Sequence, residues 1–538
     1  MTDVLSIDDL RIDIAGQRIV DGVSLSIGPG ACLGLVGESG SGKSMTALAA
    51  LGLLPPGATV GPGSSIRIGG QEVLGLPEAA LRRLRGGQVG IVFQDPMSSL
   101  NPFMRVGAQI MEAVCTHRGV SRAEARRRAL ELLTEVGIRD PGRRIDAYPH
   151  ELSGGQQQRV MIAMALSTDP ALLIADEPTT ALDATVQHQI LALLARLRAQ
   201  RGMAMMFISH DLGVVAAVAE QVAVMRRGQL VEAGPVGKLL VQPGHPYTRA
   251  LIAARRRLVD GRPAPEAREG GTRGVAVERL RIVYRGRFGL DRPFVAVEGA
   301  DLTIGPGQSL GLVGESGSGK SSLALALAGL IRPEGGRIAM LGQEFTRQSW
   351  RIPRHLRGKR QIVFQNPTGA LNPRLTIRRQ LDEPLDAIGV PVGPGRLRRI
   401  SGLLSEVGLD DGFLDRFPHE MSGGQKQRVC IARAVLSDPD VLICDEVVSS
   451  LDVTTQLQVL DLLNALRRQR GFAMLFIGHD LDVVAAISDR IAVMHEGRIV
   501  ETGPARDVID RPSNAYTRTL IEAMNAVRLP DMAGASIP

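Results

Sequence analysis

Two short stretches of the sequence have the residue types and spacing of a loop that binds phosphate. GLVGESGSGKS occurs at 34–44 and again at 311–321, and both copies fit the pattern GxxxxGK[ST]. Glycines in such a loop let backbone N–H groups point inward at the β- and γ-phosphates, the lysine adds a point charge, and the serine hydroxyl is a ligand for Mg²⁺. The predicted phosphate-binding residues are Gly37, Gly40, Gly42, Lys43, Ser44, Gly314, Gly317, Gly319, Lys320 and Ser321.

Lysine usage separates these loops from ordinary glycine-rich turns, which a chain with 62 glycines has in abundance. Only five of the 63 basic residues are lysine, and two of the five, Lys43 and Lys320, stand in the same place in the two loops. Arginine does not replace lysine where a compact charge is needed. We therefore expect nucleotide binding at both loops.

Two pairs of carboxylates follow apolar runs that are typical of buried parallel strands. LLIADE ends in Asp176-Glu177 and VLICDE ends in Asp445-Glu446. Because ligands gather beyond the carboxyl ends of such strands, we expect Asp176 and Asp445 to hold Mg²⁺. The neighbouring Glu177 and Glu446 are then placed to polarise the attacking water.

Two glutamines and two histidines also follow apolar runs in matching positions. Gln94 and Gln365 each precede an Asp-Pro or Asn-Pro pair, and His210 and His479 each precede Asp-Leu. A single polar residue after a strand is usually structural, but a matched pair favours a functional role. We assign Gln94 and Gln365 to the nucleotide and Mg²⁺ sites, and His210 and His479 to γ-phosphate contact.

The elements that must position these residues come in two copies. The phosphate loops lie 277 residues apart, whereas LSGGQ/MSGGQ, the Asp-Glu pairs, the histidines and YTRALI/YTRTLI all recur at 269. A repeat of this length predicts two homologous domains at 1–254 and 275–528, a linker at 255–274 and a flexible tail at 529–538.

Within each copy, short alternating runs such as 23–27 favour antiparallel strands, and strands at 33–36, 172–175 and 205–208 alternate with helices such as 45–54. The stretch 106–166 has a mainly helical pattern. The sequence therefore predicts an α/β fold, with an antiparallel β subdomain and a helical subdomain in each half.

Composition excludes several other classes of protein. The net charge of +7 is spread over both signs and aromatic residues make up only 3%, so a nucleic-acid partner is not expected. Four cysteines without CxxC spacing do not predict a metal cluster or a disulfide framework. The N-terminus lacks the features of a secretory signal, and no run approaches the roughly 20 apolar residues that span a bilayer.

Taken together, the phosphate loop, the glutamine, LSGGQ, Asp-Glu, Ala-Leu-Asp and histidine resemble the nucleotide-binding domain of ABC transporters, twice on one chain. This resemblance implies two P-loop NTPase domains that bind ATP and Mg²⁺ and couple hydrolysis to transport. It also implies that each phosphate loop faces the signature of the other half. The signature residues are Ser153, Gly154, Gly155 and Gln156 in the first half and Ser422, Gly423, Gly424 and Gln425 in the second. The serine hydroxyl and the glycine N–H groups precede a helix expected to begin near Gln157, and together they offer an anion site.

A narrower resemblance links the chain to the peptide/nickel import ATPases of the dipeptide and oligopeptide type. FQDPMSSLNP, FQNPTGALNP, YPHELSGGQQQRVMIA and HPYTRALI carry this similarity. It implies docking onto two transmembrane permease subunits at 97–112 and 368–383, one copy of the fused chain per transporter, and a solute-binding protein that acts indirectly. It also implies a peripheral position on the cytoplasmic face of the bacterial inner membrane. Because 245–274 contains no cysteine, the iron–sulfur cluster of some relatives is not expected.

The two copies depart from the family pattern in different ways. An aromatic residue usually stacks on adenine, and Tyr284 fits this role in the second copy, but Ile14 stands at the matching place in the first. The second copy has Met421, Val447 and Gly478 where the family has leucine, proline and serine. None of these changes removes a catalytic group, so both sites are expected to hydrolyse ATP.

An alternative is a soluble tandem ABC ATPase that acts on ribosomes or nucleic acid. Ribosome-acting relatives typically join their cassettes by a long charged helix, whereas this linker is short and rich in glycine and proline. The transported solute is not encoded in these motifs. Peptides, glutathione, nickel chelates, opines and peptide antibiotics are all carried by similar systems.

Overall fold

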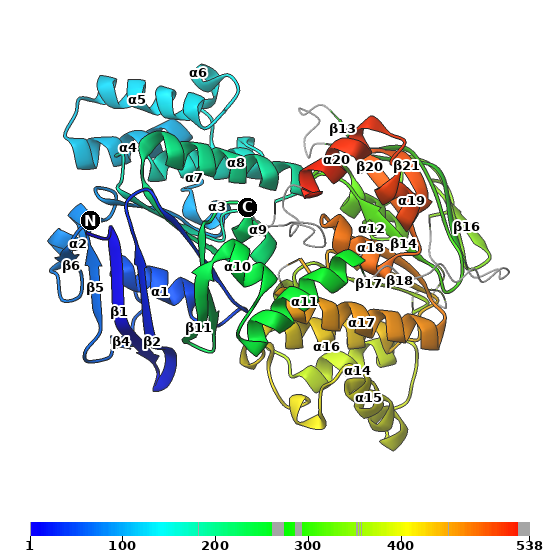
Figure 1. The fold of residues 1–538 in the computed structure, drawn as a ribbon. Coiled ribbons are helices and arrows are strands. Elements are labelled where there is room, and N and C mark those ends of the chain that lie inside the picture. The colour runs from blue at the N-terminus through cyan, green and yellow to red at the C-terminus, as the bar shows by residue number, and fades with distance from the viewer. Residues whose placement is uncertain are drawn as a thin grey trace. The chain divides into compact units, whose positions relative to one another are not determined.

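The computed structural model describes residues 2–180, 182–260, 274–285, 293–350, 353, 356, 358–449 and 451–525 (Figure 1). The described residues form two compact units. The first contains the residues up to Leu182 and Val186–Ala253, and the second contains Asp183–Thr185 and Ala254–Met524. Each unit has one antiparallel sheet, one six-stranded sheet and a group of helices.

The strands and helices of the first unit alternate along most of its length. Its strands are β1 (Leu5–Ile14), β2 (Gln17–Ile27), β3 (Cys32–Val36), β4 (Ala58–Val60), β5 (Ser65–Ile68), β6 (Gln71–Glu72), β7 (Val89–Val92), β8 (Leu172–Asp176), β9 (Ala204–Ser209), β10 (Gln221–Arg226) and β11 (Gln229–Pro235). Its helices are α1 (Lys43–Ala50), α2 (Glu78–Leu84), α3 (Pro96–Ser99), α4 (Val106–Arg118), α5 (Arg122–Glu135), α6 (Pro141–Arg144), the 3₁₀ turn η1 (Pro149–Glu151), α7 (Gly154–Ala165), α8 (Ala184–Arg201), α9 (Leu212–Ala216) and α10 (Val236–Val241). Helix α11 (Pro246–Asp260) begins in this unit.

The second unit repeats most of this order, although its described residues contain no counterpart of β4 or α2. Its strands are β12 (Val275–Tyr284), β13 (Phe294–Ile304), β14 (Ser309–Val313), β15 (Gly335–Met340), β16 (Gln343–Thr346), β17 (Arg360–Val363), β18 (Val441–Asp445), β19 (Ala473–Ile477), β20 (Arg490–His495) and β21 (Arg498–Pro504). Its helices are α12 (Lys320–Leu327), α13 (Pro367–Ala370), α14 (Ile377–Ala387), α15 (Pro394–Glu406), the 3₁₀ turns η3 (Asp411–Phe413) and η4 (Pro418–Glu420), α16 (Gly423–Val435), α17 (Val453–Arg470), α18 (Leu481–Ile487), α19 (Ala505–Asp510) and α20 (Ala515–Asn525).

The six-stranded sheets of the two units have the same topology. The order is β11-β10-β3-β9-β8-β7 in the first unit and, read in the same direction, β21-β20-β14-β19-β18-β17 in the second. All neighbours pair in parallel except the edge strands β11 and β21, which are antiparallel. This is the α/β architecture that the sequence predicts.

Both faces of each six-stranded sheet are buried, which explains the continuous apolar runs. On β8, Leu172 and Ile174 pack into one core with the antiparallel sheet and α1, whereas Leu173 and Ala175 pack into a second core with α7 and α8. The alternation of side chains along a strand sends neighbours to opposite faces, so a strand between two cores is apolar throughout.

A group of helices forms a separate part of each unit. In the first unit, α4 packs on α5 and both contact α7, and Figure 1 shows α4, α5 and α6 gathered away from β1 and β2. In the second unit, α14 and α15 contact α16 in the same way. These helices are the helical subdomain expected from the pattern of 106–166.

Several predicted boundaries shift, and two segments cannot be compared. Helix α1 begins at Lys43, two residues before the expected start, and ends at Ala50 because the following residues turn. Residues 255–260 of the predicted linker continue α11, while 261–273 and the predicted tail at 529–538 lie outside the described residues. The domain boundaries therefore stay a prediction. Among the described residues, we find no helix with the length and apolarity needed to cross a membrane.

We expect Phe207→Ala to lower the free energy of unfolding by about 3–5 kcal/mol, because this ring is fully buried on β9 and its loss leaves a cavity. Urea denaturation followed by circular dichroism measures the change. Phe103→Ala is the matched control, because its side chain is 90% exposed and its loss should change stability by less than about 0.5 kcal/mol. Equal midpoints for the two variants would contradict this placement of the core.

Candidate functional site

The two glycine-rich loops connect a central strand to a helix in each unit. The first runs from β3 to α1 and the second from β14 to α12, so each loop ends at a helix N-terminus, which favours an anion. Gly42 and Gly319 have φ of 100° and 104°, a conformation that only glycine adopts readily. The conformation of the loops therefore depends on the glycines that the motif contains.

The loop lysines are almost fully buried and fold back on their own loops. Lys43 Nζ donates to the carbonyl oxygens of Gly37 and Glu38 at 2.7 and 2.9 Å. Lys320 Nζ donates to the equivalent carbonyls of Gly314 and Glu315, both at 2.8 Å. The ammonium groups thus lie within the loops in which they are expected to bind phosphate.

The other predicted residues meet the loop because four parallel strands end at one edge. Strands β3, β9, β8 and β7 are consecutive neighbours, and they lead respectively into the first phosphate loop, His210, Asp176-Glu177 and Gln94. Strands β14, β19, β18 and β17 lead in the same way into the second loop, His479, Asp445-Glu446 and Gln365. Gly37 of the first loop and His210, which are 173 positions apart in the sequence, are therefore brought to the same edge of the sheet.

The loop serine and the strand-end aspartate make direct contact in both units. Ser44 Oγ donates to Asp176 Oδ1 at 3.0 Å, and Ser321 Oγ lies 3.4 Å from Asp445 Oδ1. Burial, reinforced by the charge of Glu446, raises the pKa of Asp445 to about 6, and burial likewise raises the pKa of Asp176. Carboxylate and hydroxyl oxygens are a donor set suited to Mg²⁺.

The glutamate after each aspartate is held by the histidine and the glutamine. His210 Nδ1 lies 3.3 Å from Glu177 Oε1, and Gln94 Nε2 donates to Glu177 Oε2 at 3.0 Å. In the second unit, His479 Nδ1 lies 3.4 Å from Glu446 and Gln365 Nε2 donates to it at 2.8 Å. Each glutamate is thus fixed from two sides, at the place where an attacking water is expected.

The contact between the glutamate and the histidine shifts the pKa values of both groups. Burial alone would raise the pKa of Glu177, but the hydrogen bond and charge of His210, together with the Thr180 hydrogen bond and the charge of Lys43, hold that pKa below its ordinary value. Burial would lower the pKa of His210, but Glu177 outweighs burial and raises it. The pKa values of Glu446 and His479 shift in the same directions. The glutamates are therefore ionised at neutral pH, as a base that orients water must be.

Backbone strain marks the same two glutamates. Glu177 and Glu446 have φ of 47° and 49°, in the left-handed region that residues other than glycine rarely occupy. Strain of this kind clusters at functional sites. No pattern in the sequence predicts it.

The signature residues form the first turn of a helix. Ser153 and Ser422 are the N-caps of α7 and α16, and each makes a capping box with the glutamine three residues later. The expected start near Gln157 is wrong by three residues, because the capping box lets the helix begin at Gly154. The predicted anion site of Ser153–Gln156 and Ser422–Gln425 therefore sits directly at a helix N-terminus.

The predicted adenine-stacking residues occupy matching ends of matching strands. Tyr284 ends β12, its ring is 42% exposed, and its hydroxyl lies 3.2 Å from Ser322 Oγ, next to the loop serine Ser321. Ile14 ends β1 in the first unit and is half-buried. The structure thus places an aromatic ring beside the second phosphate loop and an aliphatic side chain at the corresponding strand end of the first unit.

The structure also adds residues that motif reasoning did not assign. The hydroxyls of Tyr247 and Tyr516 accept hydrogen bonds from the backbone of the phosphate loops. Thr180 Oγ1 donates to Glu177 Oε2 at 2.9 Å. The matched spacing of the two YTR sequences was the signal that could have identified the tyrosines.

This fold and site define a protein with two P-loop ATPase cores on one chain. A family model described as ABC transporter matches residues 20–180 and 297–449. A second model, described as the C-terminal region of oligopeptide/dipeptide transporters, matches 231–276 and 500–537. The chain belongs to the ABC transporter family, and it binds and hydrolyses ATP.

Characterised relatives match almost the whole chain. It is 46% identical over 529 residues to the peptidoglycan transport ATP-binding protein YejF of Agrobacterium fabrum. The alignment covers 97% of this chain and 96% of the relative. It is 44% identical over 542 residues to the glutathione import ATP-binding protein GsiA of Pectobacterium atrosepticum. This alignment covers 95% of this chain and 87% of the relative. A solved dimeric ATP-binding cassette bound to ADP and Pi is 26% identical, with a TM-score of 0.39, and covers 43% of this chain and 99% of its own.

We expect the Lys43 site to bind ATP more weakly than the Lys320 site, because Ile14 offers no ring to stack on adenine. Stacking of a base on an aromatic ring contributes about 1–3 kcal/mol. Equilibrium binding of a slowly hydrolysed fluorescent ATP analogue should therefore be at least about fivefold tighter in Lys43→Ala, which keeps the second loop, than in Lys320→Ala.

Adding Tyr284→Ile to the Lys43→Ala variant is the control, and it should remove most of that difference. Equal affinities of Lys43→Ala and Lys320→Ala would contradict the expectation.

Proposed function

We propose that this protein is the energy-coupling ATPase of an importer for peptides or related small solutes. The observation that carries the proposal is that both nucleotide sites keep their lysine, aspartate, glutamate and histidine in matching geometry. The relatives named above are a peptidoglycan transport and a glutathione import ATP-binding protein. The C-terminal regions of both halves also match the oligopeptide/dipeptide transporter model. The choice among peptides, glutathione and other small solutes rests with other chains.

In this proposal, the residues of each unit act together on ATP. Lys43 and the loop N–H groups hold the β- and γ-phosphates, and Ser44, Gln94 and Asp176 are placed to hold Mg²⁺. When bound, Mg²⁺ supplies charge neutralisation at the phosphate oxygens. Lys320, Ser321, Gln365 and Asp445 have the same roles in the second unit.

The glutamates and histidines complete the hydrolytic groups. The ionised carboxylates of Glu177 and Glu446 orient water, and His210 and His479 contact the γ-phosphate. We further propose that the signature helix of each half supplies N–H groups to the nucleotide of the other half. The capped N-termini of α7 and α16, whose dipoles favour an anion, support this role.

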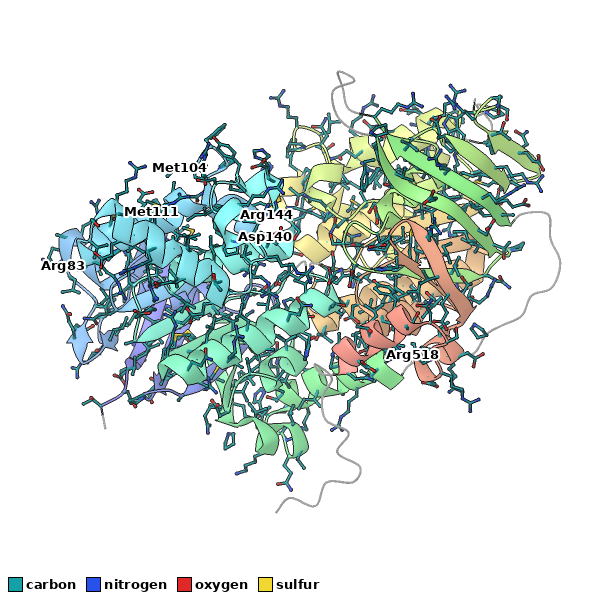
Figure 2. The ribbon with its side chains drawn as sticks, turned by 90° about the horizontal axis from the view of Figure 1, so that it is seen from above. Arg83, Met104, Met111, Asp140, Arg144 and Arg518 are labelled. Carbon is teal, nitrogen blue, oxygen red and sulfur yellow. The ribbon has the colours of Figure 1, made fainter. Side chains whose placement is uncertain are left out.

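Segments 97–112 and 368–383 are proposed to dock onto two membrane permease subunits. The first carries the highly exposed apolar side chains Met97 and Phe103, which are 76% and 90% exposed. Figure 2 shows Met104 and Met111 on this same part of the first unit. Because these segments follow Gln94 and Gln365 directly, a change at the nucleotide can reach them through the backbone.

The remaining parts of the assembly follow from this role. One copy of the chain carries both ATPase halves, so it serves one transporter on the cytoplasmic face of the inner membrane. A solute-binding protein acts on the permeases and not on this chain.

We expect the double variant Glu177→Gln, Glu446→Gln to keep ATP binding but to lose turnover and uptake, because the amides cannot polarise water. Measurements of analogue binding, phosphate release and uptake of labelled peptide in membranes test this together. Glu124→Gln, an exposed change on α5, is the control and should leave all three unchanged. Undiminished uptake in the double variant would refute the coupling scheme.

Copurification tests the class of partner independently. Retention on membranes with two hydrophobic subunits supports the importer, whereas cosedimentation with ribosomes would favour the tandem ATPases that act there.

A further inference from the structure

A tyrosine hydroxyl contacts the outer side of each phosphate loop. Tyr247, on α11, accepts a hydrogen bond from the backbone N–H of Glu38 at 3.2 Å. Tyr516, on α20, accepts the same bond from the N–H of Glu315 at 3.0 Å. Glu38 and Glu315 are the second residues of the two GxxxxGKS loops, so the two contacts are equivalent.

These bonds fix one peptide unit of the loop from both ends. The peptide between Gly37 and Glu38 has its N–H bound by the tyrosine, while its carbonyl oxygen, that of Gly37, accepts from Lys43 Nζ at 2.7 Å. The peptide between Gly314 and Glu315 is bound in the same way by Tyr516 and by Lys320 Nζ, the latter at 2.8 Å. Rotation of this peptide would therefore break the tyrosine bond and displace the loop lysine at the same time.

The tyrosine rings are themselves held by the strand next to the loop strand. The Arg226 guanidinium, at the end of β10, lies over the Tyr247 ring at 4.8 Å from its centre. His495, at the end of β20, stacks on the Tyr516 ring with 3.9 Å between centres. The ring partners differ between the units, so the hydroxyl contact with the loop is the feature that both share.

The helices that carry the tyrosines are tied to the same sheets at their N-termini. Glu232 of β11 accepts hydrogen bonds from the N–H groups of Gly244 and His245, at 2.7 and 3.1 Å. In the second unit, Glu501 of β21 accepts from Ser513 and Asn514, at 2.8 and 3.1 Å. The N-terminus of each tyrosine-bearing helix is thus attached to the sheet of its own unit, and this attachment fixes the position of the tyrosine.

We propose that Tyr247 and Tyr516 are positioning residues, which hold the phosphate loops in the shape that binds nucleotide. The C-terminal region of each unit, matched as a separate model at 231–276 and 500–537, thereby sets the nucleotide affinity of that unit. This inference rests on the proposed role of the two loops. Burial raises the pKa of Tyr516 to about 12, so its hydroxyl stays neutral at the pH of the cell.

The test uses Tyr247→Phe and Tyr516→Phe in the full-length protein, because each removes one hydroxyl and keeps the ring. Binding of ADP and of the fluorescent ATP analogue is measured in Lys320→Ala, where the first loop is intact, and in Lys43→Ala, where the second is intact. We expect each tyrosine change to weaken binding at its own loop by about three- to tenfold, the range for one hydrogen bond between neutral groups. Binding at the other loop should change less than about twofold.

Tyr148→Phe is the matched control. Tyr148 lies 269 residues before Phe417, so this change gives the first unit the residue that the second already has, and it should leave affinity unchanged. With both loops intact, the tyrosine changes should raise the KM for ATP while kcat and the thermal midpoint stay close to those of Tyr148→Phe.

The outcomes distinguish the proposed nucleotide sites from the proposed role of the two tyrosines. If the combined change Lys43→Ala, Lys320→Ala leaves nucleotide binding intact, the proposed sites are wrong. If that variant loses binding but Tyr247→Phe and Tyr516→Phe bind as tightly as Tyr148→Phe, only the tyrosine inference is overturned. A fall in affinity that appears equally at both loops also overturns it.

Discussion

The structure depends on a phosphate loop that packs directly against neighbouring backbone. A Cβ atom at Gly37 would lie 2.2 Å from the carbonyl oxygen of Met225, and one at Gly42 would lie 2.9 Å from that of Ile19. The loop can therefore take this path only with glycine at these positions. The loop is also held by Tyr247, which accepts a hydrogen bond from the N–H of Glu38, and by Lys43, which donates to the carbonyls of Gly37 and Glu38. The second unit repeats this arrangement, with 2.0 Å between a Cβ at Gly314 and the Met494 oxygen.

Parallel pairing brings the other candidate residues to this loop. Four strands end at one edge, so an Asp-Glu pair, a histidine and a glutamine from separate parts of the sequence meet beside the loop. The strained backbone of Glu177 and Glu446 persists because the surrounding hydrogen bonds hold both side chains in place.

The two halves have kept the reacting groups and changed the residues around them. Ser209 Oγ accepts the N–H of Asp211 before the first histidine, whereas Gly478 stands at that place in the second unit. Arg226 and His495 hold their tyrosines by different interactions, and Ile14 and Tyr284 differ beside the loops. These differences lie around the loops and the histidines, while the lysine, serine, aspartate, glutamate, glutamine and histidine of each site are the same in both units.

The sequence by itself determined the repeat and the α/β class, and it singled out the loop and carboxylate residues of the candidate sites. These features depend on residue types at fixed local spacing, where glycine conformation, apolar periodicity and charge act over a few residues. Only the tertiary structure decided that His210 and Gln94 hold Glu177 and that Tyr247 is hydrogen-bonded to the loop. Those contacts join residues that are far apart along the chain, and no local pattern encodes which strands will lie side by side.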